Sequence, residues 1–199
     1  PFAEDDPLLL GATNEPRWSY ASSKALGEGL AFAHAREQGL PVVVVRFFNV
    51  VGPRQRGSYG MVVPRFVRAA LAGEPLEVYG DGTQTRCFLH VLDAVSAVLA
   101  LWDEPRARGQ VVNVGSAREL SIQALAECVR AAAASRAPIV HMPYREAYGM
   151  AMEDFRRRAP ELTRLTDLIG ARTIRGLESI VAELVASGAA QPTSAARQP

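Results

Sequence analysis

The sequence predicts an α/β protein built around a parallel sheet that is doubly wound, with helices on both faces. With 199 residues and 48% hydrophobic content, the chain is large enough to bury a core. The run VVVVRFF at 42–48 is continuous and β-branched, which is typical of a parallel strand covered on both faces. A helical pattern and Gly39 precede this run. Helix, turn and buried strand together form half of a β-α-β crossover, the unit of a doubly wound sheet.

The first part of the chain is expected to contain two loops and two helices around that strand. Residues 1–18 are acidic and carry Pro, Gly and Asn, as surface loops do. From Ser19 to Gln38 apolar residues recur at helical spacing. Residues 52–60 form a second loop, and a helix over 61–73 follows it, with Pro64 in the first turn.

The rest of the chain alternates strand and helix patterns. Strands are expected at 76–79, 86–91, 110–115 and 138–142. Helices are expected at 92–103, 121–134, 161–170 and 176–187, the second of them capped by Ser121. Residues 144–160 are rich in Tyr, Met and Arg and are expected to form an irregular loop. The tail from Gly188 lacks an apolar pattern, so we expect it to be disordered.

Composition and charge exclude several classes of protein. There are 22 basic and 21 acidic residues, and a net charge of +1 gives no general attraction for nucleic acid or for a membrane surface. We find no signal peptide and no apolar run of about 20 residues, so we expect a cytoplasmic protein that does not span a membrane. Cys87 and Cys128 share no CxxC spacing and are interpreted as buried thiols, and the three histidines are too scattered to indicate a metal site.

Tyr20 and Lys24 form a candidate acid-base pair. They lie four residues apart on a predicted helix, so both side chains project from one face. A free tyrosine has a pKa of about 10. A nearby ammonium lowers that pKa, so the phenol can take and return a proton, and the same ammonium can hold the ribose hydroxyls of a nicotinamide cofactor. The alternative is a surface helix on which Tyr and Lys occur together by chance.

A set of motifs around this pair makes the chain resemble the extended short-chain dehydrogenase/reductase family, and within it the NAD-dependent epimerases, dehydratases and decarboxylases of nucleotide sugars. The motifs are YASSK with its helix, VVVVRFFNVVGPRQ at 42–55, VVPRFVRAALAGEPLEVYGDGTQTRCFLHVLDAV at 62–95, VVNVGS at 111–116 and LIG at 168–170. They follow the order and spacing of that family and cover about residues 1–185. Among them, GEPLEVYGDGTQTR is far more specific than Tyr-x-x-x-Lys.

The resemblance implies that NAD is the cofactor and that three residues serve it. Tyr20 would be the catalytic acid/base that takes the proton from a sugar hydroxyl, most often O4. Lys24 would tune Tyr20 and bind the nicotinamide ribose, and Phe48 would pack near the nicotinamide.

The resemblance also implies a site for a nucleotide-diphosphate sugar. Asn49 would reach the sugar or the diphosphate, Val63 would lie over the nucleotide base, and Arg86 would clamp the diphosphate, for which a planar, permanently charged donor is suited. Tyr144 and Tyr148 are further candidates for the sugar pocket, although packing on the nearest helix explains such aromatics more often.

A second arginine is implied on the far side of the nucleotide, in the segment EDFRRRAPEL at 153–162. The choice among Arg156, Arg157 and Arg158 stays open, with a preference for Arg157 or Arg158 because these precede the Ala-Pro-Glu step. A solvated basic cluster that pairs with Glu153 and Asp154 is an almost equal alternative.

The resemblance divides the chain into parts of two domains. Residues 1–51 correspond to the end of a Rossmann domain, and 52–187 mainly to a smaller α/β domain that binds the nucleotide sugar, with 91–115 returning to the Rossmann sheet. The Gly-rich turn that holds NAD in this family has no counterpart here, so the chain is expected to be the carboxy-terminal portion of such an enzyme. Expressed alone, it is expected neither to bind NAD tightly nor to turn over substrate.

The reaction expected from the resemblance is 4-epimerisation of a nucleotide sugar through a 4-keto intermediate, as in UDP-glucose 4-epimerase. Two alternatives share the first oxidation: a nucleotide-sugar 4,6-dehydratase and a UDP-glucuronate decarboxylase, the latter needing a cation for the sugar carboxylate. A non-catalytic nucleotide-sugar-binding fragment is an alternative of another class. Family members form dimers through the helix that carries Tyr20, so a homodimer is expected of the full-length protein, with Leu26, Leu30 and Ala33 as its apolar face unless these pack in the core.

Overall fold

The computed structural model describes residues 1–15, 17–55, 57, 61–148 and 155–188. Within these ranges the chain is a mixed α/β protein with parallel strand pairs, which confirms the predicted fold class. The helices are α1 Arg17–Gln38, α2 Val62–Ala72, α3 Val91–Asp103, η1 Pro105–Ala107 (a 3₁₀ turn), α4 Ile122–Ala132, α5 Tyr144–Tyr148, α6 Thr163–Ile169 and α7 Leu177–Ala186. The strands are β1 Val44–Phe47, β2 Val50–Val51, β3 Leu76–Tyr79, β4 Thr85–Cys87, β5 Leu89–His90, β6 Val111–Val114, β7 Glu119–Ser121, β8 Ile139–Met142 and β9 Arg157–Arg158.

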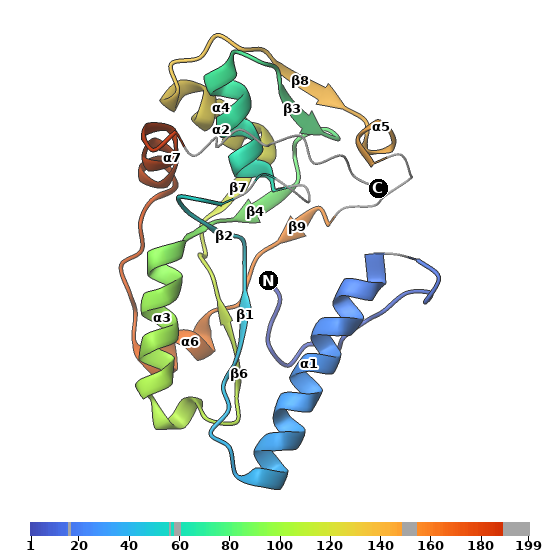
Figure 1. The fold of residues 1–199 in the computed structure, drawn as a ribbon, viewed down its shortest axis with the longest axis vertical. Coiled ribbons are helices and arrows are strands. Elements are labelled where there is room, and N and C mark those ends of the chain that lie inside the picture. Colours follow the sequence, from blue (N-terminus) through green and yellow to red (C-terminus); the bar gives the residue numbers. More distant parts are fainter. Residues whose placement is uncertain (16, 56, 58–60, 149–154, 189–199) are drawn as a thin grey trace.

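The parallel pair of β1 and β6 forms one part of the molecule. Val44 lies opposite Val111 and Phe47 opposite Val114. In Figure 1 the pair lies between α3 and α1, in the lower half of the view. The chain leaves β1, forms the elements of the upper half, and returns through α3 to β6, so strands far apart in sequence become neighbours. The boundary between the two predicted domains stays a prediction.

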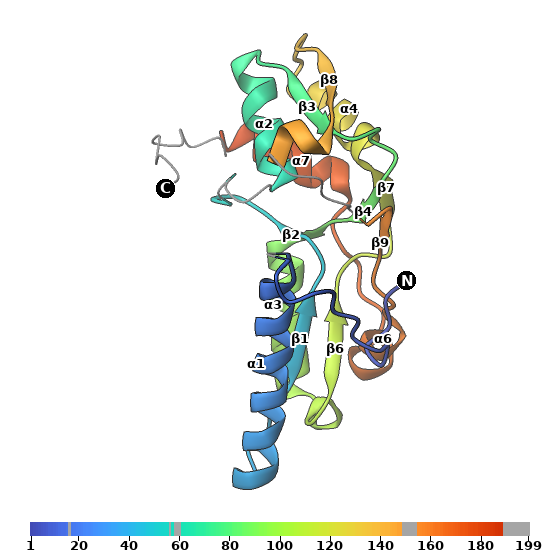
Figure 2. The ribbon, with the colours of Figure 1, turned by 90° about the vertical axis from the view of Figure 1, so that its right-hand side faces the viewer.

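The second part of the molecule combines small sheets with the helices α2, α4, α5 and α7 (Figure 1). β3 and β8 pair in parallel, and β4 lies between β7 and β9. Figure 2 shows these elements above the β1–β6 pair. The prediction of a single strand at 86–91 is wrong, because the segment forms two strands. β4 pairs with β7 and β9, whereas β5 pairs with β2, and the change of partner falls at Phe88.

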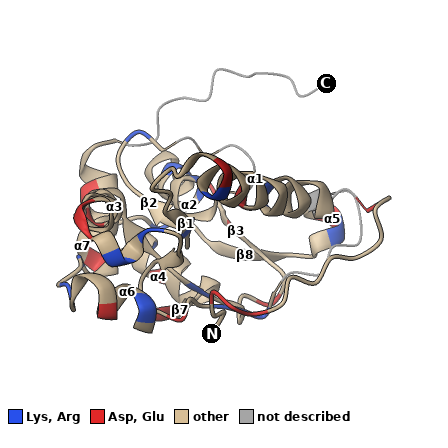
Figure 3. Cartoon of the chain, turned by 90° about the horizontal axis from the view of Figure 1, so that it is seen from below, with Lys and Arg blue, Asp and Glu red and all other residues tan. Residues whose placement is uncertain are grey.

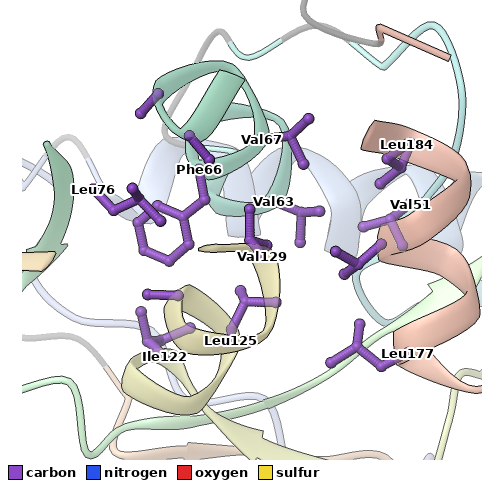
Figure 4. Packing of buried hydrophobic residues seen from close by; sticks show 14 of the residues in the cluster. Val51, Val63, Phe66, Val67, Leu76, Ile122, Leu125, Val129, Leu177 and Leu184 are labelled. Carbon is purple, nitrogen blue, oxygen red and sulfur yellow. The ribbon is translucent and has the colours of Figure 1, made fainter. Parts of the chain in front are cut away.

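The buried apolar residues form two clusters. The larger one joins α2, α4 and α7, and it includes Phe66, Leu76, Leu125 and Leu184. Figure 4 shows Phe66 extending from α2 toward α4, with Leu76 beside it and Leu184 projecting from α7. Ser121 begins α4 as predicted, since its hydroxyl oxygen accepts from the amide of Ala124 at 3.1 Å. The smaller cluster lies between α3, α6 and the β1–β6 pair.

Helix α1 differs from the other long helices in how it is held. Among the described residues, neither hydrophobic cluster includes a residue of α1. Its side chain Glu28 accepts two hydrogen bonds from Arg46 of β1, at 2.8 and 2.7 Å. Leu26 and Leu30 are 64% and 52% exposed, so core packing does not account for them. Whether they form a dimer face stays a prediction.

The segment after β8 is more regular than the sequence indicates. The expectation of an irregular loop over 144–160 is wrong at both ends, where α5 and β9 form; residues 149–154 lie outside the described residues. β9 exists because β4 offers it a parallel partner, which local sequence does not reveal. The predicted tail lies outside the described residues from 189 onward.

The turn Gly80-Asp81-Gly82 connects β3 to β4. Both glycines have a positive φ, 74° and 75°, which favours glycine. A Cβ on Gly80 would lie 2.6 Å from the ring of Tyr144, so the turn also needs glycine for space. Asp81 closes the turn by accepting from the amide and the hydroxyl of Thr83. The turn therefore lies in close contact with Tyr144, the first residue of α5.

The charged residues do not gather by sign. Figure 3 shows Lys and Arg interspersed with Asp and Glu over the elements visible from below. No helix within the described ranges combines the length and the apolar composition needed to cross a membrane. The described residues also hold no group of three or more His, Cys, Asp or Glu arranged to bind a metal ion.

Candidate functional site

Tyr20 and Lys24 lie together near the amino end of α1. The Lys24 ammonium is 5.3 Å from the centroid of the Tyr20 ring, so the two side chains share one face of the helix as their spacing predicts. Tyr20 is 71% exposed, and Ser23 donates a hydrogen bond to its backbone carbonyl at 2.7 Å. A cation beside an accessible phenol suits proton transfer with a ligand that approaches from solvent.

A cavity of about 240 Å³ opens beside the amino end of α2. Three of the predicted site residues line it together: Asn49, Val63 and Arg86. Tyr20 and Lys24 are not among the described residues that line it. The structure therefore brings the predicted nucleotide-sugar residues together, and it keeps the acid-base pair on a separate element.

Asn49 and Val63 enter the cavity from different elements. Asn49 has a positive φ of 43°, a conformation that asparagine tolerates better than most residues. Its side-chain amide donates to the carbonyl of Cys87 at 2.8 Å, which ties the end of β1 to β4. Val63 stands in the first turn of α2 and is 1% exposed, so it supplies a fixed apolar wall. These positions are compatible with the predicted contacts to sugar and base, which stay predictions.

Arg86 is held firmly where it meets the cavity. One terminal nitrogen of its guanidinium donates to the carbonyls of Thr85 and Phe155, at 2.7 and 2.8 Å. A half-buried guanidinium fixed by backbone carbonyls loses little freedom when it binds an anion. This placement fits the predicted role of Arg86 at a diphosphate.

The strand β9 separates Arg157 from Arg158. Thr85 pairs with Arg157 and Arg86 with Arg158 in a parallel register, and successive side chains of a strand point to opposite faces. Arg157 donates to both carboxylate oxygens of Glu119, at 2.5 to 3.0 Å, and this bonding lowers the pKa of that carboxyl group. Arg158 lies on the face of Arg86. Of the two preferred arginines, we therefore retain Arg158 as the diphosphate candidate.

Phe48 follows β1 and is buried. The guanidinium of Arg158 lies 5.5 Å from the centroid of its ring. On another side, a Cβ on Gly115 would lie 3.0 Å from the Cβ of Phe48, so the two backbones approach closely. Phe48 thus links the end of β1 to β9, and its predicted place near a nicotinamide stays a prediction.

The sequence reasoning missed several residues of the cavity wall. Met61 is the cap residue of α2, and its side chain makes no hydrogen bond to the first amides of the helix. Met61 and the first residues of α2 line the cavity. Amides at a helix start without a side-chain cap attract anions. Arg65 also lines the cavity, with its guanidinium 4.0 Å from the centroid of Tyr79. Tyr144 was weighed only weakly from sequence; it lines the cavity and accepts from the Gln84 amide at 3.0 Å. Pro64 was the sequence signal that could have pointed to this wall, because a proline in the first turn marks the start of α2.

The residues present fit one end of a nicotinamide cofactor. A phenol and an ammonium on one exposed helix face match the nicotinamide ribose and the alcohol that is oxidised beside it. The Gly-rich turn that holds a pyrophosphate in dinucleotide-binding folds is absent from the sequence. That Tyr20 and Lys24 form the proton-transfer end of such a site stays a prediction.

Comparison with known proteins places these features in context. Residues 2–115 match the model of the NAD dependent epimerase/dehydratase family. The UDP-N-acetyl-alpha-D-glucosaminuronate decarboxylase of Bacillus cytotoxicus is 48% identical over 169 residues, which cover 84% of this chain and 52% of that protein.

Two solved structures have the same fold. The NDP-hexosamine 5,6-dehydratase TunA aligns with a TM-score of 0.79 and 29% identity, over 96% of this chain and 58% of that one. The UDP-glucose 4-epimerase of Thermotoga maritima aligns with a TM-score of 0.75 and 28% identity, over 84% of this chain and 52% of that one. The chain thus spans about half the length of the relatives that it matches. That it corresponds to their carboxy-terminal part stays a prediction, because the matches give shares of length only.

Proposed function

The chain belongs to the NAD-dependent epimerase/dehydratase family, and from this premise we propose that it serves the decarboxylation of a UDP-linked uronic sugar. The observation that carries the proposal is its 48% identity to a UDP-N-acetylglucosaminuronate decarboxylase over 84% of the chain. This supports the decarboxylase alternative better than the 4-epimerase, which was the main expectation from sequence.

The charges of the cavity support an anionic sugar nucleotide. Arg65 and Arg86 are the charged residues among the described ones that line the cavity, and Glu77, the ion-pair partner of Arg65 at 3.6 Å, is not among them. The substrate of such a decarboxylase carries a diphosphate and a sugar carboxylate. Arginine binds both groups through paired N–H donors.

The first step of the proposed reaction is oxidation at C4 of the sugar. Tyr20, as phenolate beside the Lys24 ammonium, accepts the proton of the C4 hydroxyl as that carbon becomes a ketone. NAD, when bound, supplies the reversible oxidation of this carbon. Lys24 stabilises the phenolate and holds the ribose of the cofactor.

The ketone makes loss of carbon dioxide easy. Once C4 is a carbonyl, the C6 carboxylate stands β to it. The C5–C6 bond breaks, carbon dioxide leaves, and the electron pair passes into an enolate whose oxygen is on C4. A proton from water adds to C5 and restores the ketone. C4 becomes an alcohol again with the hydride that the first oxidation gave to bound NAD, and Tyr20 returns the proton to O4. Arg86 and Arg158 hold the diphosphate while the sugar reacts.

The reaction class is tested with the protein encoded by the whole reading frame, supplied with NAD. It is incubated in parallel with UDP-N-acetylglucosaminuronate, UDP-glucuronate and UDP-glucose. We expect carbon dioxide and a UDP-linked five-carbon sugar from a uronate, and no product from UDP-glucose. A C4 epimer formed without loss of carbon dioxide would reject the proposal. Tyr20→Phe should lower kcat by about 10²–10⁴-fold, the usual contribution of general acid-base catalysis.

A 4-epimerase is the second candidate function, supported by the structural likeness to the Thermotoga maritima enzyme. It uses the same oxidation at C4 and the same pair of residues. The two functions differ in whether the sugar carries a carboxylate that leaves. The parallel incubation with UDP-glucose therefore decides between them.

A further inference from the structure

A second, smaller cavity lies where the chain passes between the two parts of the molecule, and its volume is about 150 Å³. Three connecting segments line it: Phe88 between β4 and β5, Ser116 and Arg118 between β6 and β7, and residues 174–176 between α6 and α7. In Figure 1, α6 lies in the lower half of the view and α7 in the upper half. Because Phe88 also lines the cavity beside α2, the two cavities share one wall residue.

Ser116 brings a buried hydroxyl group to this second cavity. The residue is 3% exposed, and its oxygen accepts a hydrogen bond from the amide of Arg118 at 3.1 Å. Within the described part of the chain, the proton of this hydroxyl has no acceptor. A buried donor left unpaired costs free energy, and native structures retain few of them. An acceptor inside the cavity would complete the hydrogen bonding of Ser116.

Arg175 brings one edge of its guanidinium to the same cavity. Its backbone amide donates to the carboxylate of Asp93 at 2.8 Å, and its Nη1 bonds the other oxygen of that carboxylate. Its Nε and Nη2 have no hydrogen-bond partner among the described residues. These two nitrogens stand side by side in the guanidinium plane, and such a pair of N–H donors matches the two oxygens of a carboxylate. The bonds to Asp93 also hold the side chain in place, so it loses less freedom when it binds an anion.

The charges around the cavity limit the charge of its ligand. Arg118, the second cation in the wall, bonds both oxygens of Glu178 at 2.7 and 2.5 Å, as Arg175 bonds Asp93. The two carboxylates offset the two guanidinium groups, so these four groups carry no net charge together. A ligand with a single negative charge therefore suits the site better than a phosphate group, which carries nearly two.

The remaining walls are apolar and leave little room. They are formed by Phe88, Leu120, Ile174 and Leu177. The volume corresponds to on the order of five water molecules at about 30 Å³ each. This space admits a few carbon atoms beside a charged group, and it is too small for a nucleotide.

From these observations we propose that the second cavity binds a small monocarboxylate with a short apolar body. The carboxylate bonds the Nε–Nη2 edge of Arg175 and the hydroxyl of Ser116, and the apolar body lies against Phe88 and Leu177. Because the ligand contacts all three connecting segments, its binding holds the two parts of the molecule together. The inference does not rest on the proposed function.

The test follows binding of 3-methylbutanoate to the full 199-residue chain by two-dimensional NMR, which gives both the affinity and the residues affected. We expect saturable shifts of amide signals in 116–118 and 174–178. 3-Methylbutanamide has the same shape without the charge and should bind at least about tenfold more weakly, since hydrogen bonds to a charged group are the stronger ones. Acetate lacks the apolar body and should also bind at least about tenfold more weakly.

Variants test the place of the site. Arg175→Gln should weaken binding of 3-methylbutanoate about tenfold. Arg172→Gln is the matched control, because Arg172 lies on the same segment and bonds α3 through the Ser96 hydroxyl at 2.8 Å, but is not among the described residues that line the cavity. Arg86→Gln, in the cavity beside α2, should leave the affinity unchanged as well.

Every outcome bears on the inference. Absence of saturable shifts overturns it, as does equal weakening in Arg175→Gln and either control variant. An amide or an acetate that binds as tightly as 3-methylbutanoate overturns the assigned ligand class. Thermal melting shows whether Arg175→Gln is folded. If it is not, Ser116→Ala removes the buried hydroxyl alone and should weaken binding about fivefold, and no weakening there overturns the inference.

Discussion

The cavity and the acid-base pair lie in regions that are packed to different degrees. The cavity is built on α2, whose inner face meets α4 and α7 in the larger hydrophobic cluster. Tyr20 and Lys24 stand on α1, and no described residue of α1 belongs to either cluster. A bidentate ion pair between Glu28 and Arg46 joins α1 to β1.

This difference separates the two tasks of the proposed enzyme. Residues that would hold the nucleotide sugar are fixed by buried packing within this chain. Residues that would move protons are fixed mainly by the geometry of one helix. Because no described residue of α1 belongs to either hydrophobic cluster, local opening should cost least there.

The largest expected effect comes from removing the centre of the packed region. Phe66 is fully buried between α2 and α4, and Phe66→Ala should lower the free energy of unfolding by about 3–5 kcal/mol. Urea denaturation measures this loss. Leu26→Ala on α1 is the control and should change stability by less than about 0.5 kcal/mol, because the side chain is 64% exposed. Similar losses in both variants would remove the distinction between the regions.

The next effect concerns binding in the packed region. Arg158→Ala should weaken UDP-glucuronate binding by about 1.5–3 kcal/mol, the range for hydrogen bonds to charged groups. Arg157→Ala should change the affinity little, because that side chain is bonded to Glu119 on the opposite face of β9. Titration calorimetry of the two variants compares them directly. A larger loss in Arg157→Ala would reverse our assignment.

A smaller effect is expected where α1 meets β1. Hydrogen bonding to Glu28 raises the pKa of Arg46, and Glu28→Gln removes the charge that does so. We expect faster hydrogen exchange of α1 amides, with a loss of at most about 1 kcal/mol in global stability. Glu178→Gln on α7 is the matched variant, since Glu178 also pairs with an arginine, Arg118. In Glu178→Gln the amides of α7 should keep their protection from hydrogen exchange. Equal acceleration of exchange in α1 and α7 would contradict the difference between the two regions.

The smallest effect is expected from Tyr20→Phe on stability. The side chain is 71% exposed, so loss of its hydroxyl should shift the free energy of unfolding by less than about 0.5 kcal/mol. Thermal and urea denaturation both report this quantity. A destabilisation above 1 kcal/mol would mean that Tyr20 is part of the fold as well as of the chemistry.

Local sequence signals predicted the regular elements well. Gly73 ends α2 in the left-handed conformation with a φ of 70°, and Ser121 caps α4, because both effects depend on neighbouring residues only. The split of 86–91 into two strands and the existence of β9 were missed. Both depend on which distant strand lies alongside, and no local pattern encodes that choice.

The candidate site divides in the same way. Asn49, Val63 and Arg86 were predicted from the resemblance, and they meet in one cavity although they stand on different elements. Arg65, Tyr79 and Gln55 were not singled out, because their place in the wall follows from side-chain packing. The separation of Tyr20 from this cavity could not be predicted either, since it depends on how α1 sits against β1.

The two-residue strand β9 has a consequence for how this sequence can change over time. Its pairing sets Arg158 opposite Arg86, and Arg157 and Arg156 precede it in the chain. A deletion or insertion that slips the strand by one or two residues in one direction would set Arg157 or Arg156 opposite Arg86. A slip in the other direction would set Ala159 there. A run of three arginines therefore gives the position opposite Arg86 a tolerance to length variation that a single arginine would lack.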